Sequence, residues 1–295
     1  MHPDSVQKTA FRVPWGLFEF TRMPQGLVNS PSTFERLMEL VLGEFNLTEL
    51  VIYLDDILVF SASVEEHLSR LEKAFQRLSK FSLKLNPAKC EFFKHEVRFL
   101  GHVVNGSGIS TDPEKVRKIL AWPRPSNSEQ LSSFPGLASY YRKYIDHFSQ
   151  VAGPLHALVS KGRVNSGKGQ SRDFQWSDKA EDAFVLLKSK LCKAPVLAYP
   201  DFGKDFVVEV DASLSGLGAC LSQYDAKGDL HPIAFASRCL RGAGKKYPDY
   251  SSFKIELLAL KWAVTEKFRG YLRGAHTIVL TDHNPLAYLK TATGN

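Results

Sequence analysis

Two adjacent carboxylates interrupt an otherwise apolar run between Leu50 and Phe60. The run predicts two short buried strands joined by a tight turn at Asp55 and Asp56. Two-residue turns of this kind favour Asn-Gly or Asp-Gly, because positive φ is needed and neighbouring like charges repel. A divalent cation would supply the missing opposite charge, since such ions prefer hard oxygen ligands. The pattern therefore indicates a metal site, with an ordinary polar turn as the alternative.

The net charge of +7 is concentrated in the middle of the chain. Residues 121–200 carry 11 Lys and Arg against 6 Asp and Glu, whereas residues 1–120 carry 15 of each kind. A basic central segment suits contact with a phosphate backbone, and a solvated positive face without a partner is the alternative. Because no apolar run is long enough to cross a bilayer and no signal peptide follows Met1, we expect an intracellular protein that is not secreted.

The first zone, residues 1–109, is predicted to be an α+β layer. Asn29 or Ser30 is placed to cap a helix with Pro31 in its first turn, and Ser63–Glu66 has the form of a capping box. The predicted elements are helices at 29–45 and 63–78, strands within 50–60, at Leu83–Leu85 and at Val97–Val104, and a turn at Asn105–Gly108.

The second zone, residues 110–172, is predicted to be mainly helical. Asp112-Pro113 indicates the start of a short helix, and Ser126–Glu129 begins another. Pro135 is expected to kink or end that second helix, because proline lacks an amide donor and clashes with the preceding turn. The segment Gly162–Arg172 is rich in Gly, Ser and Lys and predicts a flexible surface insertion.

Three tyrosines, Tyr140, Tyr141 and Tyr144, are interleaved with Arg142 and Lys143. Aromatic and basic residues mixed on one helix can stack on nucleic acid and neutralise its charge. A half-buried amphipathic helix whose charged ends reach solvent is the favoured alternative.

The third zone, residues 173–295, is predicted to be a mixed sheet covered by helices. With the first two zones it makes an α+β and α/β multidomain protein. The predicted elements are helices at Ser177–Lys190 and Ser251–Val264 and strands at Asp205–Val210, Gly216–Gln223, His231–Ser237 and Thr277–Asp282.

Three carboxylates of this zone are candidates for one metal site. Asp211 and Asp282 each close an apolar strand. Glu256 lies roughly 200° around its helix from Lys254, so it shares the inward side with apolar residues. A lone inward carboxylate is costly unless it is paired, and convergence on divalent metal would pair all three. Turn capping by either aspartate, and an ion pair between Glu256 and a buried Arg, are the alternatives.

An ordered set of short motifs resembles the reverse transcriptase and ribonuclease H region of gypsy-type long-terminal-repeat retrotransposon polyproteins. The similarity runs along nearly the full chain. It is carried by Lys8–Phe11, Phe20–Leu27, Ser30–Phe34, Tyr53–Asp56, Lys89–Phe92, Phe99–His102, Gly136–Leu137, Tyr140–Arg142, Ala194–Ala198, Asp211–Ser213, His231–Ser237, Glu256–Leu260 and Thr281–Leu286.

The resemblance implies an RNA-directed DNA polymerase and ribonuclease H that use Mg²⁺, with Mn²⁺ as the alternative. Its implied partners are an RNA template, a DNA primer, the RNA–DNA hybrid and deoxynucleoside triphosphates, inside a cytoplasmic particle or the nucleus. It implies a partial palm at residues 1–109, a thumb and connection at 110–172 and a ribonuclease H-like domain at 173–295. The implied sites are Asp55 and Asp56 as the palm metal pair, Gln25 and Gly26 near nucleotide and template, Phe99, Leu100, Gly101 and His102 as primer grip, and Asp211, Glu256 and Asp282 as ribonuclease H metal ligands.

The chain also departs from the family pattern. The family's third palm aspartate and its fingers would precede Lys8, and the last ribonuclease H strand and helix, with a fourth aspartate, would follow Asn295. We therefore expect the polymerase activity to be absent in this chain, and residual ribonuclease H activity. A non-catalytic nucleic-acid-binding remnant is the alternative function, and an incomplete chain that does not fold stably is a third.

Overall fold

The computed structural model describes residues 1–164, 174–213, 215–240 and 251–281, which form two compact units, Met1–Lys94 and His95–Asn295. The first unit is shorter than the predicted first domain, residues 1–109. The difference arises because Ile109 forms a bridge with Leu197, which ties the strands around it to the second unit. No helix within the described ranges is long and apolar enough to span a bilayer.

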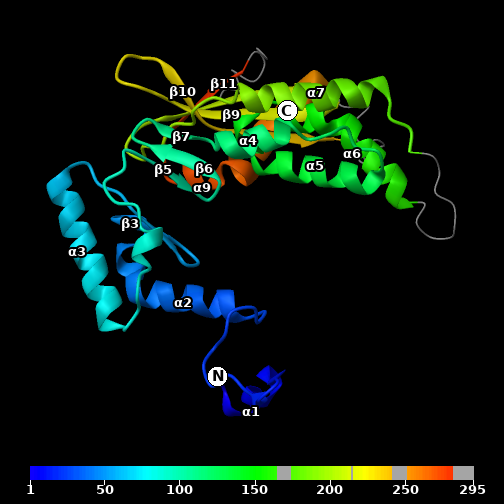
Figure 1. Ribbon diagram of the computed structural model, residues 1–295. Coiled ribbons are helices and arrows are strands. Elements are labelled where there is room, and N and C mark those ends of the chain that lie inside the picture. Colours follow the sequence, from blue (N-terminus) through cyan, green and yellow to red (C-terminus); the bar gives the residue numbers. More distant parts are fainter. Residues whose placement is uncertain (165–173, 214, 241–250, 282–295) are drawn as a thin grey trace. The chain divides into compact units, whose positions relative to one another are not determined.

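The first unit packs two amphipathic helices, α2 and α3, against the hairpin β3–β4 (Figure 1). Ser63 Oγ accepts a hydrogen bond from the Glu66 amide at 3.2 Å, and Glu66 Oε2 accepts one from the Ala62 amide at 2.8 Å. These two bonds confirm the predicted capping box. The elements of the first unit are α1 (Pro3–Val6), η1 (Gln7–Thr9), β1 (Phe11–Val13), β2 (Gly16–Phe18), α2 (Ser30–Leu42), η2 (Gly43–Phe45), β3 (Leu50–Tyr53), β4 (Asp56–Val59), α3 (Val64–Lys80) and η3 (Pro87–Lys89).

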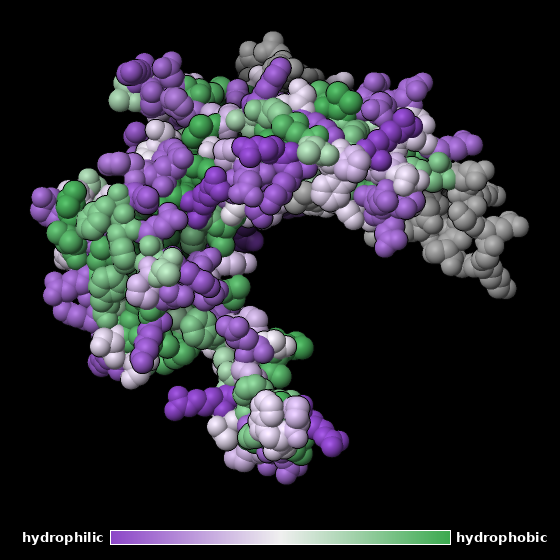
Figure 2. Space-filling model, in the orientation of Figure 1, coloured by the Kyte–Doolittle hydropathy of each residue, from purple (hydrophilic) through white to green (hydrophobic). Residues whose placement is uncertain are grey.

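The apolar core of this unit is small. It consists of Met38, Val41, Leu42, Leu50, Ala74 and Leu78, with partly buried neighbours. Hydrophobic side chains are exposed over α3, including Val64, Leu68 and Phe75, as the green surface there shows (Figure 2). Leu50 is the one buried residue of β3 and β4, so the prediction of two buried strands is wrong.

The predicted strand at Leu83–Leu85 is also wrong, because Leu83 completes the end of α3 instead. Ser82 has a φ of +57°, and the Leu83 amide donates to the Leu78 carbonyl at 2.9 Å. This is the hydrogen bond of a Schellman motif, which turns the chain out of the helix. Leu83 then packs against the core of the unit.

The second unit begins with a three-stranded antiparallel sheet of β5 (Glu96–Phe99), β6 (His102–Asn105) and β7 (Gly108–Thr111). The predicted strand Val97–Val104 is thus a hairpin of two strands. The predicted turn at Asn105–Gly108 joins β6 to β7 and is confirmed. Main-chain hydrogen bonds of 2.8 and 2.9 Å between Ile109 and Leu197 attach this sheet to the rest of the unit.

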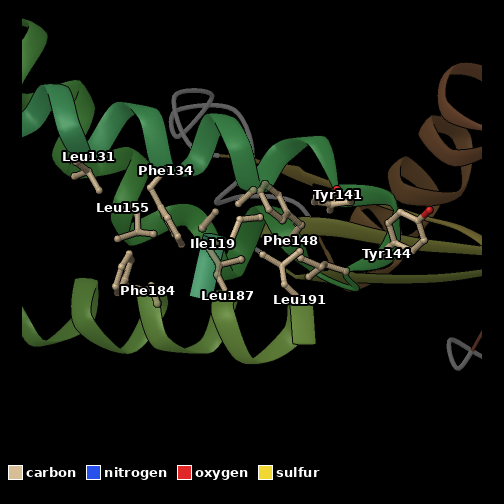
Figure 3. Packing of buried hydrophobic residues seen from close by; sticks show 14 of the residues in the cluster. Ile119, Leu131, Phe134, Tyr141, Tyr144, Phe148, Leu155, Phe184, Leu187 and Leu191 are labelled. Carbon is tan, nitrogen blue, oxygen red and sulfur yellow. The ribbon is translucent and has the colours of Figure 1, made fainter. Parts of the chain in front are cut away.

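Four helices follow and share one apolar core: α4 (Pro113–Leu120), α5 (Ser128–Tyr140), α6 (Phe148–Val164) and α7 (Asp178–Cys192). Figure 3 shows this core, with Tyr141 and Tyr144 at one end of it. Because α7 packs with the earlier helices, the core crosses the predicted boundary at residue 172. The first three residues of the predicted Gly162–Arg172 insertion lie in α6, and residues 165–172 lie outside the described ranges.

Pro135 lies inside α5 and does not end it. An internal proline costs a helix about 3 kcal/mol, because one hydrogen bond is lost. On the same helix Leu131, Phe134 and Ala138 are fully buried in the shared core. Their burial contributes more than the proline costs, at roughly 1.5–3 kcal/mol for each large apolar side chain.

The last part of the unit is a four-stranded sheet in the order β10–β9–β8–β11, in which only β11 runs parallel to its neighbour. Helix α8 packs on β8, and a second apolar cluster joins them. The predicted strands and helices of this zone are confirmed within the described residues. The elements of this part are β8 (Phe206–Ser213), β9 (Gly216–Tyr224), β10 (Leu230–Cys239), α8 (Ser252–Trp262), a π-helical turn η5 (Ala263–Lys267), α9 (Arg269–Leu272) and β11 (Thr277–Leu280). Earlier in the chain, a short 3-10 helix, η4 (Arg142–Tyr144), precedes α6.

Candidate carboxylate sites and nucleic-acid interface

Asp55 and Asp56 lie at the tip of the β3–β4 hairpin. Tyr53 pairs with Asp56, so the two turn residues are Leu54 and Asp55, and Asp56 opens β4. The predicted Asp-Asp turn is therefore shifted by one residue, with Leu54 at a φ of +54°. A left-handed leucine costs about 1–2 kcal/mol, which the turn has to absorb.

Both aspartates are exposed, and neither has a salt bridge to any residue that the structure describes. Two adjacent carboxylates without a neighbouring cation repel each other and form a hard oxygen donor set, which fits a divalent ion. Within the described ranges no group of three His, Cys, Asp or Glu side chains is arranged to hold a metal. The hairpin therefore provides a pair of ligands.

Gln25 and Gly26 form an exposed turn just before α2. Ser30, the first residue of α2, fixes this turn: its hydroxyl donates to the Pro24 carbonyl at 2.8 Å, and its amide donates to the Leu27 carbonyl at 3.0 Å. The described structure thus presents the Gln25 side chain to solvent beside the start of a helix.

The predicted primer grip, Phe99–His102, is the two-residue hairpin between β5 and β6. Leu100 and Gly101 occupy the turn with φ values of +48° and +69°. Positive φ at both central positions is the geometry of a type I′ turn, which matches the twist of paired strands. Glycine suits the second position because it has no Cβ to clash in this region.

Three tyrosine hydroxyls hold this turn. Tyr140 donates to the Leu100 carbonyl, and Tyr141 donates to the Gly101 carbonyl at 2.6 Å. The Tyr144 hydroxyl and His102 Nδ1 share a hydrogen bond of 3.0 Å. Tyr141 and Tyr144 are buried, whereas Tyr140 is 49% exposed and stacks on the His102 ring. Tyr141 and Tyr144 are buried beyond the end of α5 at Tyr140, so the expected single amphipathic helix is broken here.

Burial shifts the pKa values of the residues around this turn. Desolvation, assisted by the nearby Lys143 ammonium, lowers the pKa of His102 to about 4. Desolvation, with a contribution from the Asp112 carboxylate, raises the pKa of Tyr141 to about 12. At neutral pH the imidazole and the phenol are therefore uncharged, which favours the hydrogen bonds that fix the turn.

Asp211 lies on β8, two residues before the strand ends. It pairs with Gly218 on β9 and shares its sheet face with Glu209, whereas Val208 and Val210 face the apolar cluster with α8. His147 Nε2 lies 3.4 Å from the Asp211 carboxylate and 3.2 Å from Asp146. These residues border a cavity of about 310 Å³.

Gly218 is required by the approach of His147. A Cβ at this position would lie 2.7 Å from the His147 ring, closer than side-chain carbons pack. His147 itself has a φ of +53°, a region that non-glycine residues rarely adopt. The imidazole contacts Asp211, and the sequence did not reveal this contact because 64 residues separate the two side chains.

The other two ribonuclease H candidates differ in what the structure shows. Glu256 is 8% exposed on α8, which confirms that it points inward. Asp282 lies outside the described residues, beyond β11, whose register on β8 ends with Leu280 opposite Glu209. The structure thus places Asp211 and Glu256 on two elements that pack together, but with Asp211 on the sheet face away from the cluster formed by α8.

Comparisons with known proteins divide the chain in a similar way. Residues 1–104 match a family model described as reverse transcriptase (RNA-dependent DNA polymerase), and residues 176–279 match one described as RNase H-like domain found in reverse transcriptase. Both families use divalent metal ions.

Similar curated proteins include Drosophila melanogaster retrovirus-related Pol polyproteins. That from transposon 297 is 39% identical over 98% of this chain, and that from transposon gypsy is 35% identical over 96%. The chain spans 26% and 27% of their lengths.

Similar solved structures are foamy viral protease–reverse transcriptases. One in complex with double-stranded DNA has a TM-score of 0.81 and 26% identity, covering all of this chain and 58% of the other. One in complex with an RNA/DNA hybrid has a TM-score of 0.76 and 25% identity, covering 99% of this chain and 38% of the other.

Proposed function

Because the chain belongs to the family of retrotransposon Pol polyproteins, with their reverse transcriptase and RNase H-like domains, we propose that it acts on RNA–DNA hybrids as part of reverse transcription. The observation that carries this proposal is the exposed Asp55–Asp56 pair at a hairpin tip, inside the region that matches the reverse transcriptase family. An RNA template, a DNA primer and deoxynucleoside triphosphates are the proposed partners, in an intracellular setting.

Each unit carries a proposed polymerase feature of its own: the first unit carries the metal ligands, and the second carries the primer grip. Asp55 and Asp56 would hold Mg²⁺, with Gln25 and Gly26 near the nucleotide and template. Magnesium bound there would activate the primer 3′-hydroxyl and stabilise the departing pyrophosphate. The Leu100–Gly101 turn, fixed by its tyrosines, would hold the primer backbone.

The proposed ribonuclease H site consists of Asp211, Glu256 and Asp282, also with Mg²⁺, although in this structure Asp211 lies on the sheet face away from the cluster formed by α8. His147 adds a feature to this site, because its imidazole already contacts the Asp211 carboxylate at 3.4 Å. Such a contact holds the Asp211 carboxylate beside the imidazole. Metal binding at Asp211 would then have to compete with that contact or share the carboxylate with it.

Cleavage of an RNA–DNA hybrid by the full chain in Mg²⁺ tests the nuclease. We expect Glu256→Gln, which keeps the side-chain shape, to lower the cleavage rate by about two orders of magnitude or more, because a metal ligand is lost. Glu266→Gln is the matched control, because the Glu266 side chain is exposed and its one ion pair, to Arg238, is long at 3.8 Å. Equal cleavage by both variants would rule out Glu256 as a ligand.

Primer extension tests the polymerase. The hairpin site consists of two carboxylates, and among the described residues no third acidic ligand joins them. Because two-metal catalysis depends on a full set of ligands, we expect no nucleotide incorporation by the isolated chain. Tight hybrid binding without either activity would instead favour a non-catalytic nucleic-acid-binding protein.

A further inference from the structure

A cationic pocket crosses the edge of the four-stranded sheet at β10. Its volume is about 190 Å³, and Arg142, Lys143 and Lys267 line it together with aromatic rings. Arg142 and Lys143 come from η4, and Lys267 ends the π-helical turn η5, so the three cations come from segments far apart in the sequence. The remaining lining residues are Ala234, Phe235, Ala236, Phe268 and Tyr271.

The three cations lack acidic partners within the residues that the structure describes. The Arg142 guanidinium donates to the Ser237 carbonyl at 2.7 Å and lies over the Phe148 ring. Lys143 Nζ lies 5.2 Å from the centre of the Tyr144 ring, and burial lowers its pKa. Glu266, which directly precedes Lys267, is paired with Arg238 instead. An anion would therefore gain from three positive charges at once.

The sheet edge adds a backbone donor. Among the described strands β10 pairs with β9 alone, and on its other edge the Pro232 carbonyl accepts from the Ala198 amide at 2.8 Å and the Ser237 carbonyl accepts from Arg142 at 2.7 Å. Because the Ser237 carbonyl points outward to Arg142, the backbone groups of Phe235, two residues earlier, point to the same side. The Phe235 amide therefore points away from β9, to the edge of β10 that Arg142 approaches, and Phe235 is one of the residues that line the pocket.

We propose that this pocket binds a backbone phosphate of a nucleic-acid duplex, which deepens the proposed function and rests on it. Arg142, Lys143, Lys267 and the outward Phe235 amide would contact the phosphate oxygens. The rings of Phe268 and Tyr271 would face the adjoining sugar.

Continuity with the primer-grip turn favours a duplex over a free anion. Lys143 lies close enough to His102 to affect its charge, and Tyr144, the next residue, hydrogen-bonds that imidazole. One short helix therefore supports the turn on one side and supplies cations to the pocket on the other. A strand held at the turn would reach the pocket with its next phosphates, whereas a free phosphate would gain nothing from the turn.

The salt dependence of hybrid binding by the full chain tests the pocket. Each lost phosphate contact lowers the slope of log K against log salt by about 0.9. We expect Lys267→Gln to lower it by about that amount, so that a fourfold rise in salt weakens its binding about 3.5-fold less than it weakens wild-type binding. Lys179→Gln, an exposed change on α7, is the matched control and should keep the wild-type slope.

The outcomes separate the two proposals. If the wild-type chain shows no salt-dependent hybrid binding, the proposed function and the pocket both fail. If wild type binds but Lys267→Gln keeps its slope, the pocket alone is wrong. Because Lys267 is exposed and supports no core contact, misfolding does not obscure this result.

Lysine acylation distinguishes a duplex from a small anion. We expect the hybrid to protect Lys267 from acylation, as read by mass spectrometry, and inorganic phosphate at the same total phosphate concentration to leave it reactive. Equal protection by inorganic phosphate would overturn the duplex assignment in favour of a small-anion site.

Discussion

The two hairpin tips that carry the proposed polymerase residues are supported in different ways. At the β3–β4 tip, Asp55 and Asp56 are exposed, and no described cation pairs with them. At the β5–β6 tip, three tyrosine hydroxyls bond to Leu100, Gly101 and His102. Both turns contain a left-handed leucine, Leu54 and Leu100, but the second turn residue has positive φ only at Gly101 and not at Asp55, so the turns differ in conformation as well as in surroundings.

The difference teaches where the geometry of each site comes from. The β5–β6 turn is preorganised by the protein, because hydrogen bonds from Tyr140 and Tyr141 fix its two carbonyls. At the β3–β4 tip the two neighbouring carboxylates repel each other, and no described cation offsets that repulsion. One turn is fixed by contacts within the protein, and the other has its charge uncompensated.

The largest expected effect comes from removing a buried ring of the tyrosine cluster. Tyr141→Ala should lower the free energy of unfolding by about 3–5 kcal/mol, because a fully buried aromatic side chain leaves a cavity and an unbonded Gly101 carbonyl. Urea denaturation followed by circular dichroism measures this. Tyr53→Ala in β3, where the ring is 48% exposed, is the control and should cost about 1 kcal/mol or less. Equal losses of unfolding free energy in Tyr141→Ala and Tyr53→Ala would contradict the comparison of the two hairpin tips.

A smaller effect should come from Mg²⁺ at the other tip. A ligand at ten times its Kd stabilises the folded state by about 1.4 kcal/mol. We expect Mg²⁺ to raise the free energy of unfolding of the first unit by about that amount, as read from urea denaturation, and the double change Asp55→Asn and Asp56→Asn to abolish the rise. Without Mg²⁺ the double variant should be as stable as wild type or slightly more stable, because like-charge repulsion is removed. A retained Mg²⁺ response would place the ion elsewhere.

The sequence predicted most elements of the second unit because their signals are local. Asp112 caps α4 through the Glu114 amide, and Ser177 caps α7 through the Ala180 amide, as their side chains suggested. The pattern of apolar residues placed β8, β9 and β10 within a few residues. The inward position of Glu256 also followed from helical periodicity.

Errors arose where distant contacts override local signals. Pro135 does not end its helix because Leu131 and Phe134 are buried in a core shared with α7, while the kink stays a prediction. The strand predicted at Leu83–Leu85 is replaced by a helix cap. The β5–β7 sheet packs with the second unit through the Ile109–Leu197 bridge and the tyrosine hydrogen bonds to its turn. The tyrosine bonds to the turn span about 40 residues, so no local pattern could show them.

The third prediction uses pH to separate the two tips. The pKa of His102 is lowered to about 4 in the folded protein, against about 6.5 for an unperturbed imidazole. Between these values the unfolded chain binds more protons, so the stability of the second unit should fall as pH drops from about 6.5 to about 4. Urea midpoints across that range should show a shallower fall for His102→Gln than for wild type. Parallel curves would mean that the imidazole is not buried neutral.

The smallest effect should come from the exposed member of the cluster. Tyr140→Phe removes one hydroxyl from a ring that is 49% exposed, and water can replace it at the Leu100 carbonyl, so we expect a loss of about 0.5 kcal/mol. Tyr141→Phe removes a hydroxyl from a fully buried ring, where water cannot enter, and should cost about 1–3 kcal/mol. Paired denaturation of the two variants measures the difference. If Tyr140→Phe cost as much as Tyr141→Phe, the turn would be fixed by hydrogen bonding alone and not by the burial that separates it from the carboxylate tip.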